Sequence, residues 1–181
     1  TSTEIFTIEA PDAVVFTEVA DSTSTACDYA NQLAANAAFA EWLNGFAVSG
    51  GCTPIFTDGM PTAPAYCGGT ATVTWTVTDH CYAGTTSTAV FTIEAPDAVV
   101  LTEVADSTST ACDYTNQGAA NAAFAEWLNG FAVSGGCTPT FTDGAPTAPA
   151  YCGGTTTVTW TETDHCYAGT TSTAVCTIEA P

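Results

Sequence analysis

The chain has 181 residues with no Lys or Arg, and its 19 acidic residues give a formal charge of −19. Because phosphate backbones are bound largely through Lys and Arg, this composition excludes nucleic acid as a partner and disfavours an anionic membrane surface. The apolar content of 46% is ample for a folded core, so the acidity does not indicate disorder. Nine cysteines in a chain of this size indicate an oxidising, extracellular environment.

An internal repeat organises the sequence. Trp75 recurs as Trp160 in the same surroundings, so the period is 85 residues. The predicted divisions are the last strand of a preceding repeat at 1–11, a first repeat at 12–96 and a second repeat at 97–181. Both chain ends fall at the same phase of the period, which is expected for a slice of a longer tandem array.

The two repeats are identical except at a few positions. The differing pairs are Phe16/Leu101, Ala30/Thr115, Leu33/Gly118, Ile55/Thr140, Met60/Ala145, Ala71/Thr156, Val77/Glu162 and Phe91/Cys176. An enzyme rarely needs two copies of one site in series, whereas a stalk, a spacer or a multivalent binder does. The near-identity therefore favours a structural or adhesive array over an enzyme.

The first half of each repeat predicts one strand and one helix. Residues 12–21 are rich in valine and lack helix signals, which predicts an extended strand. Residues 28–45 are dominated by Ala, with Asp28 as a plausible N-cap and Gly45 suited to the position just past the helix. This segment predicts an amphipathic helix of roughly four turns that covers a sheet.

The second half predicts strands. Residues 46–59 indicate one or two short strands, and 85–94 indicate the last strand of the repeat. Residues 70–78 alternate threonine with apolar residues, so one face is apolar and the other is threonine. Because Val77 of the apolar face becomes Glu162 in the second copy, we expect that end of the face to be exposed.

These elements predict a mainly β fold, namely tandem Ig-like β-sandwich repeats that each carry one inserted short α-helix. Pro96 ends the first repeat and Asp97 begins the next at once. The link has almost no slack, so we expect neighbouring repeats to sit end to end and semi-rigidly.

Each repeat holds four cysteines, which allow three pairings. Cys67 and Cys81 flank a strand that separates them by roughly 30 Å, far beyond disulfide reach, and this removes one pairing. Sandwich topology places Cys52 and Cys81 at one end, which leaves Cys27 and Cys67 together at the other. The predicted structural disulfides are Cys27–Cys67, Cys52–Cys81, Cys112–Cys152 and Cys137–Cys166.

Two questions about the cysteines stay open at this stage. Metal binding is the rival to disulfides, but no CxxC pair occurs and the chain has only two histidines, so zinc spacing is absent and no metal or other cofactor is expected. Cys176 is left over, in the position of Phe91. It is either a buried free thiol or the partner of a cysteine beyond position 181 or in another chain.

Two stretches resemble known repeats. The stretch "CGGTATVTWTVTDHC" with the following "TTSTAVFTIEAP" resembles the closing half of hyalin-type (HYR-like) Ig-like repeats. The stretch "ACDYANQLAANAAFAEWLNGFAVSGGC" resembles the helical insert in repeats of giant Bacteroidota surface adhesins, the SprB-like gliding-motility adhesins exported by type IX secretion. The resemblance covers nearly the whole chain and is specific only in the combined order of the motifs.

This resemblance implies a long extracellular filament at the cell surface with an adhesive end and no enzyme activity in the repeats. It also implies O-glycosylation at Ser22 and Ser107, because each lies in a "DST" triplet similar to the Bacteroidota acceptor signal. A plain exposed turn is the alternative. Many such repeats carry a further cysteine pair on their first and last strands, and Glu18 stands near the first of these positions.

Other candidate sites are weaker. His80 beside Asp79 invites a catalytic interpretation, but no serine or third cysteine lies near enough in sequence to suggest a nucleophile, and no catalytic residue is predicted. Calcium is more plausible because Asp21, Asp58 and Asp79 lie in predicted turns, although no dense DxDxD loop occurs. The threonine face at 70–78 resembles ice-binding arrays, but one strand per period argues against that function.

The sequence thus predicts a disulfide-stapled, anionic stalk within a surface filament or adhesin. Its expected partners are neighbouring repeats of the same chain and other copies in a filament. The alternative is a multivalent module in which each repeat binds a glycan or surface ligand and the copies add avidity.

Overall fold

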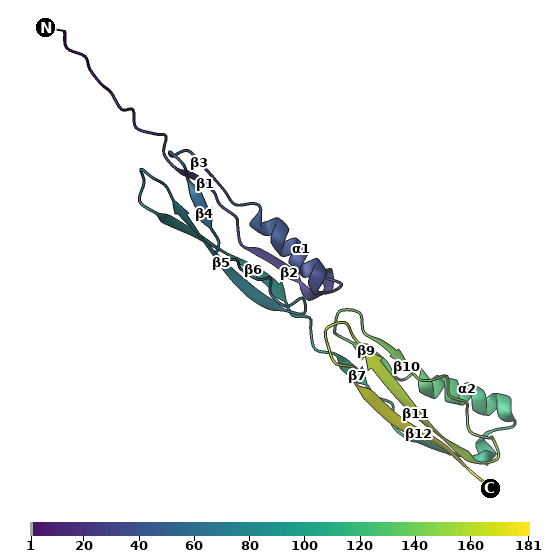
Figure 1. Ribbon diagram of the computed structural model, residues 1–181. Coiled ribbons are helices and arrows are strands. Elements are labelled where there is room, and N and C mark those ends of the chain that lie inside the picture. The colour runs from purple at the N-terminus through teal and green to yellow at the C-terminus, as the bar shows by residue number, and fades with distance from the viewer. Residues whose placement is uncertain (1) are drawn as a thin grey trace. The chain divides into compact units, whose positions relative to one another are not determined.

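The computed structural model describes residues 2–181 and divides into two compact units between Ala95 and Pro96 (Figure 1). This division lies one residue before the repeat boundary that the sequence predicts at Asp97. Each unit is mainly β and carries one α-helix, so the predicted fold class is confirmed at this level. The open sheets are consistent with a β-sandwich.

The two units have the same elements in the same order. In the first repeat these are β1 (Val15–Thr17), β2 (Ser22–Thr25), η1 (Ala26–Asp28), α1 (Gln32–Leu43), β3 (Ala47–Ser49), β4 (Ile55–Thr57), β5 (Gly69–Thr78) and β6 (Thr85–Glu94). In the second repeat they are β7 (Val100–Thr102), β8 (Ser107–Thr110), η2 (Ala111–Asp113), α2 (Gln117–Leu128), β9 (Ala132–Ser134), β10 (Thr140–Thr142), β11 (Gly154–Thr163) and β12 (Thr171–Glu179).

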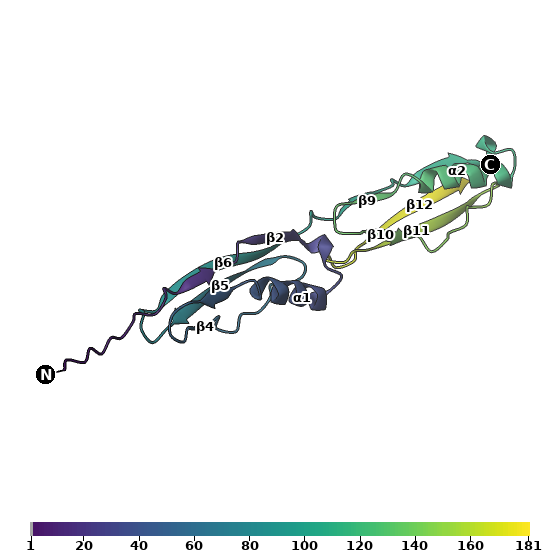
Figure 2. The ribbon, with the colours of Figure 1, turned by 90° about the horizontal axis from the view of Figure 1, so that it is seen from above.

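Each repeat is built from two layers. A four-stranded sheet has the order β2-β6-β5-β4, with β2 parallel to β6 and the other pairs antiparallel. The helix α1 and the two-stranded pair β1–β3 lie against one face of this sheet (Figures 1 and 2). The second repeat copies this arrangement with β8-β12-β11-β10 and β7–β9.

The core lies between these two layers and is aromatic. The period-2 pattern of β5 sends Val73, Trp75 and Val77 inward, and all three are buried as the sequence predicts. Trp75 stacks on Phe46 with ring centroids 4.8 Å apart and meets Trp42 of α1 at 5.7 Å. In the second repeat, Trp160 stacks in the same way on Phe131, at 4.9 Å.

The helix begins later than the sequence predicts. Asp28 does not cap it; its carboxylate accepts hydrogen bonds from the backbone N and the hydroxyl of Thr25 at 2.9 and 3.0 Å, which closes η1. The helix instead starts after Asn31, whose Oδ1 accepts from the backbone N of Ala34 at 3.1 Å. Both residue types are good N-caps, so the short-range pattern alone does not choose between them.

The predicted strand at 12–21 is also different in the structure. Only β1 forms there, and the chain then crosses to the other layer, where β2 pairs in parallel with β6. Asp21 marks the crossing, because its Oδ1 accepts from the backbone N of Val90 at 2.8 Å. This side chain satisfies a backbone donor of β6 where β2 has not yet begun to pair.

The expectation that Glu162 is exposed is wrong. Glu162 is 1% exposed, because the register of β11 puts it on the same inward face as Trp160. Its Oε2 accepts from the backbone N of Thr170 at 3.3 Å. Its Oε1 is, among the described residues, the one buried side-chain oxygen or nitrogen without a hydrogen-bond partner.

Glycine is required where the β1–β3 pair turns. Gly50 has a φ of 75°, and a Cβ there would overlap the carbonyl O of Ala13. We expect Gly50→Ala to destabilise the first repeat by about 2–4 kcal/mol, from backbone strain of about 1 kcal/mol and overpacking of about 1–3 kcal/mol. The measurement is the urea unfolding midpoint.

Gly59 provides the matched control for this substitution. Its φ is 72°, but no atom lies within 4 Å of the position that a Cβ would take. Gly59→Ala should therefore cost only the backbone strain, about 1 kcal/mol. Equal losses in the two variants would show that the close approach to Ala13 does not matter.

Candidate functional site

The two ends of each repeat carry its cysteines. We call the end at which the chain enters the N-pole and the end at which it leaves the C-pole. At the N-pole of the first repeat, Gly51 donates its backbone N–H to the carbonyl O of Asp12 at 2.9 Å, so Cys52 lies beside the start of the repeat. At the C-pole, a Cβ on Gly68 would lie 2.9 Å from the Cβ of Ala95, so Cys67 lies beside the end of the repeat.

Asp79 organises the N-pole. Its Oδ2 accepts from the backbone N of Cys52 and of Thr53, each at 2.9 Å, and its Oδ1 accepts from the backbone N of Cys81 at 2.9 Å. These hydrogen bonds, above all the one from Cys81, lower the pKa of the Asp79 carboxyl. The carboxylate thus fixes the two loops that carry the N-pole cysteines.

The N-pole of the first repeat presents a pair of thiols. The Sγ atoms of Cys52 and Cys81 lie 3.1 Å apart, and both residues are exposed. The hydrogen bond between the two thiols raises the pKa of Cys52, and desolvation and the charge of Asp79 act in the same direction.

In the second repeat an aspartate also fixes the loops that carry the N-pole cysteines. Asp164 accepts from the backbone N of Cys137 at 2.9 Å and of Cys166 at 2.8 Å. Burial acts to raise the pKa of the Asp164 carboxyl, but the backbone hydrogen bonds together lower it. Both repeats thus have a carboxylate that accepts hydrogen bonds from the N-pole loops.

The cysteines differ in oxidation state between the repeats. Those that are disulfide-bonded are Cys27, Cys67, Cys137 and Cys166. Those that are exposed thiols are Cys52, Cys81, Cys112 and Cys152. The predicted pairs Cys52–Cys81 and Cys112–Cys152 are therefore not formed in this structure.

A metal ion is the other chemistry open to the N-pole. Among the described residues, Cys52, Asp79 and Cys81 form the one group whose ligand atoms lie close enough, within 4.8 Å of one another. However, both oxygens of Asp79 already accept backbone hydrogen bonds. The corresponding cysteines of the second repeat are disulfide-bonded, so the geometry supports thiol–disulfide chemistry better than metal binding.

The predicted calcium candidates do not form one common cluster of ligands. Asp21 accepts from Val90, Asp79 accepts from the cysteine loops, and Asp58 accepts from the backbone N of Met60 at 3.0 Å. Each carboxylate satisfies backbone donors in its own surroundings, and calcium binding stays a prediction.

The remaining predicted residues are not members of the poles' thiol pairs. Cys176 is a thiol, 8% exposed, in the core cluster with Trp160, and burial raises its pKa. Ser22 and Ser107 are half-buried at the first position of β2 and of β8. His80 is exposed next to Asp79. Glycosylation and the partner of Cys176 stay untested.

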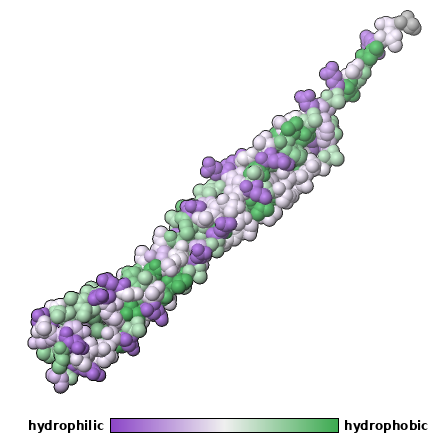
Figure 3. Space-filling model, turned by 180° about the vertical axis from the view of Figure 1, so that it is seen from behind, coloured by the Kyte–Doolittle hydropathy of each residue, from purple (hydrophilic) through white to green (hydrophobic). Residues whose placement is uncertain are grey.

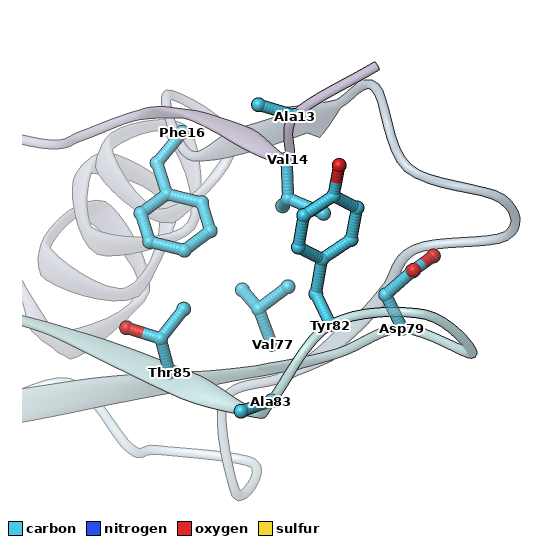
Figure 4. Close-up of a pocket in the computed structure, with 8 residues that line it drawn as sticks. All are labelled: Ala13, Val14, Phe16, Val77, Asp79, Tyr82, Ala83 and Thr85. Atoms are coloured by element: carbon cyan, nitrogen blue, oxygen red, sulfur yellow. The ribbon is translucent and has the colours of Figure 1, made fainter. Parts of the chain in front are cut away.

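A small cavity of about 310 Å³ lies beside the N-pole of the first repeat (Figure 4). Its lining residues are Ala13, Val14, Phe16, Val77, Asp79, Tyr82, Ala83 and Thr85. The Tyr82 hydroxyl donates to the carbonyl O atoms of Pro11 and Asp12, each at 3.0 Å. The Tyr82 hydroxyl in the cavity wall is therefore already hydrogen-bonded within the protein, and the walls of the cavity are mostly apolar.

Sequence reasoning misses the role of the aspartates. The sequence suggests catalysis or calcium binding for Asp79, whereas Asp79 caps backbone N–H groups of two loops. A signal is present, because an Asp directly after a strand often accepts from the backbone two residues on, and Cys81 is such a residue. The partners 26 and 27 residues upstream cannot be found this way.

Comparison with known proteins identifies no relative: no family model matches the chain, and no curated protein is significantly similar to it. Within residues 2–181, no helix is long and apolar enough to cross a membrane. The disulfide-bonded cysteines indicate an oxidising compartment, as the composition predicts.

The low pKa of Asp79 leads to a pH-dependent prediction. A carboxyl whose pKa is lowered by folding adds stability above its unfolded pKa, and this stability is lost as the pH falls through the folded pKa. We therefore expect Asp79→Ala to lower the urea midpoint of the first repeat at pH 7. The difference from the parent should shrink as the pH falls below the ordinary pKa of an aspartate, about 3.9, and vanish below the lowered pKa of the folded state.

Asp164→Ala is the matched variant in the second repeat and should shift only that repeat's transition. Both transitions can be followed in one chain by calorimetry. A loss that is the same at pH 7 and at low pH would show that the carboxylate charge is not what holds the loops.

Proposed function

We propose that the chain is a structural segment of a long extracellular filament or adhesin stalk at the cell surface, built from tandem Ig-like β-sandwich repeats. The observation that carries the proposal is that two near-identical units each fold around their own aromatic core. A unit that closes its own core can be added to an array many times, which suits a spacer or stalk.

The outer face of the main sheet supports a stalk. The side chains of β5 that point away from the core are threonines, and most of them pair in register with threonines of β6, as in the hydroxyl pair Thr74–Thr88 at 3.2 Å. The same pair recurs as Thr159–Thr173 at 3.3 Å. In the view of Figure 3, hydrophilic and hydrophobic residues are interspersed, and the hydrophilic ones do not gather in one patch.

The N-terminal segment supports an array. Phe6 and Ile8 are 88% and 81% exposed, in an extended segment that forms no strand. Their counterparts one period later, Phe91 and Ile93, are core residues of β6. Residues 2–11 therefore have the sequence of a core strand without the partner strands that would cover it, which favours the prediction that they close another repeat.

The cavity does not favour the glycan-binding alternative. Its walls are mostly apolar, and a glycan needs several free hydrogen-bonding groups. Two lining positions also differ between the repeats, because Phe16 becomes Leu101 and Val77 becomes Glu162. A multivalent binder would keep the lining of its repeated site the same.

Electron microscopy of native surface material tests the proposal. A stalk predicts long thin fibres with a regular axial repeat, decorated by an antibody raised against this segment at many evenly spaced positions. Binding of isolated repeats to an array of glycans is the companion measurement, and we expect none. Antibody labelling of compact particles only, with glycan binding, would favour the alternative.

A further inference from the structure

The early part of each repeat is tied to its last strand along one edge of the main sheet. In the first repeat, β2 forms this edge and pairs in parallel with β6, from Ser22 beside Phe91 to Thr25 beside Glu94 (Figures 1 and 2). The chain enters β2 at Ser22 and leaves the repeat just after Glu94. The entry and the exit therefore lie at opposite ends of one paired segment.

Three side-chain hydrogen bonds strengthen this pairing and extend it ahead of β2. Each joins a residue of 18–24 to a residue that lies 68 or 69 positions later, so the two segments advance together. The bonds run from the Ser87 hydroxyl to Glu18 Oε1 at 3.2 Å, from the Val90 backbone N to Asp21 Oδ1 at 2.8 Å, and from the Ser24 hydroxyl to the Thr92 carbonyl O at 3.3 Å. Residues 18–25 are thus tied to β6 along their length, and we call this contact the edge joint.

The second repeat has an edge joint of the same kind. Its strand β8 pairs in parallel with β12. Asp106 Oδ1 accepts from the backbone N of Val175 at 2.8 Å, and the Ser109 hydroxyl donates to the carbonyl O of Thr177 at 3.5 Å. The joint is therefore built by the repeated sequence and is not a feature of one copy.

We propose that the edge joint is the element of each repeat that resists tension. When a repeat is pulled by its ends, the force draws residues 18–25 towards the N-pole and β6 towards the C-pole. Because the two segments are parallel, this force slides them past each other and loads their hydrogen bonds together. Bonds loaded in this way must break at the same time, whereas bonds that are peeled from one end break one after another.

The pair β1–β3 meets the force before the joint does, but it is shorter. It has three residue pairs, and β1 precedes residues 18–25 in the chain, so its release leaves the joint in place. The proposal deepens the stalk function and rests on it for its purpose, because a stalk must carry load. The geometry of the joint does not depend on that function.

Single-molecule pulling of the full chain in reducing buffer tests the proposal. Asp21→Ala removes the shortest side-chain bond of the joint. We expect the first repeat to unfold about tenfold faster at the same force, because forced unfolding follows the unfolding rate and a hydrogen bond to a charged group contributes about this factor. Asp106→Ala should have the same effect on the second repeat, and the double variant on both.

Two further variants are the controls. Asp21→Asn keeps an oxygen that can accept from Val90 and should keep most of the resistance. Asp58→Ala also removes a carboxylate, but this carboxylate accepts from Met60 two residues later and lies outside the joint, so the rate under force should equal that of the parent. Circular dichroism confirms that each variant is folded before it is pulled.

The direction of pulling separates a load-bearing joint from a contact that only stabilises the fold. A tag inserted after Ala83, in the exposed turn between β5 and β6, allows the first repeat to be pulled between this turn and the N-terminus. Both handles then act at the N-pole, so residues 18–25 and β6 are peeled apart from one end. We expect unfolding at a clearly lower force than in end-to-end pulling, with little further effect of Asp21→Ala.

The proposal is overturned if Asp21→Ala and Asp58→Ala unfold at the same rate under force, or if the two pulling directions need the same force. Neither result would remove the stalk function, which is decided by electron microscopy of native material. Compact native particles would remove that function and leave the mechanical role of the joint as these measurements find it.

Discussion

Replacing Trp75 by alanine is expected to lower the free energy of unfolding of the first repeat by about 3–5 kcal/mol. Trp75 is 1% exposed and touches Trp42 of α1 and Phe46 just before β3, so it joins the main sheet to the second layer. The truncation leaves a cavity between the two layers. Because small domains have little stability to spare, much of this repeat should be unfolded at 37 °C.

Calorimetry of the full chain measures this effect, because the repeats unfold as separate units. Trp75→Ala should lower the transition temperature of the first repeat and leave that of the second unchanged. Trp160→Ala should have the opposite effect. Leu33→Ala is the control, since Leu33 is exposed and stands where the second repeat has Gly118. A Trp75→Ala chain with two unchanged transitions would contradict the two-layer core.

Glu162→Val is expected to stabilise the second repeat by about 1–3 kcal/mol, because a buried polar atom without a partner carries its full desolvation cost. Glu162 Oε1 is such an atom. Valine is the residue that the first repeat has at this position, where Val77 is 2% exposed in the same core, so the replacement fits the surroundings.

Val77→Glu is the reciprocal substitution and should lose a similar amount from the first repeat. The pair forms a matched test, because each variant makes one repeat resemble the other at this position. Urea unfolding of the single variants and of the double exchange would give the two free energies. If Glu162→Val destabilises the second repeat, the carboxylate has a partner or function that its burial does not indicate.

The strongly periodic elements could be predicted from the sequence. The alternation at 70–78 fixes which residues of β5 face the core, and the Ala-rich run identifies α1, because each pattern is set by neighbours along the chain. The switch of layers between β1 and β2 could not be predicted, since it depends on Asp21 meeting Val90 across the fold. The exposure expected for Glu162 was wrong for the same reason, because the burial of a side chain depends on the register of its strand and not on its polarity.

The candidate site was predicted in its residues but not in its chemistry. The sequence places cysteines at the ends of each repeat, because they flank strands and turns of known length. Their oxidation state differs between the two copies, and this difference is not encoded in the residues near each cysteine. Cys27 and Cys112 lie in the same local sequence, yet the first is oxidised and the second is a thiol.

The central claim is that each repeat bears load as a separate folded unit, and single-molecule pulling of this chain in reducing buffer tests it most directly. The account predicts two unfolding peaks, each followed by the same gain in contour length of up to about 30 nm, the extended length of one repeat. Smooth extension without peaks, or one event that releases both repeats together, would contradict it.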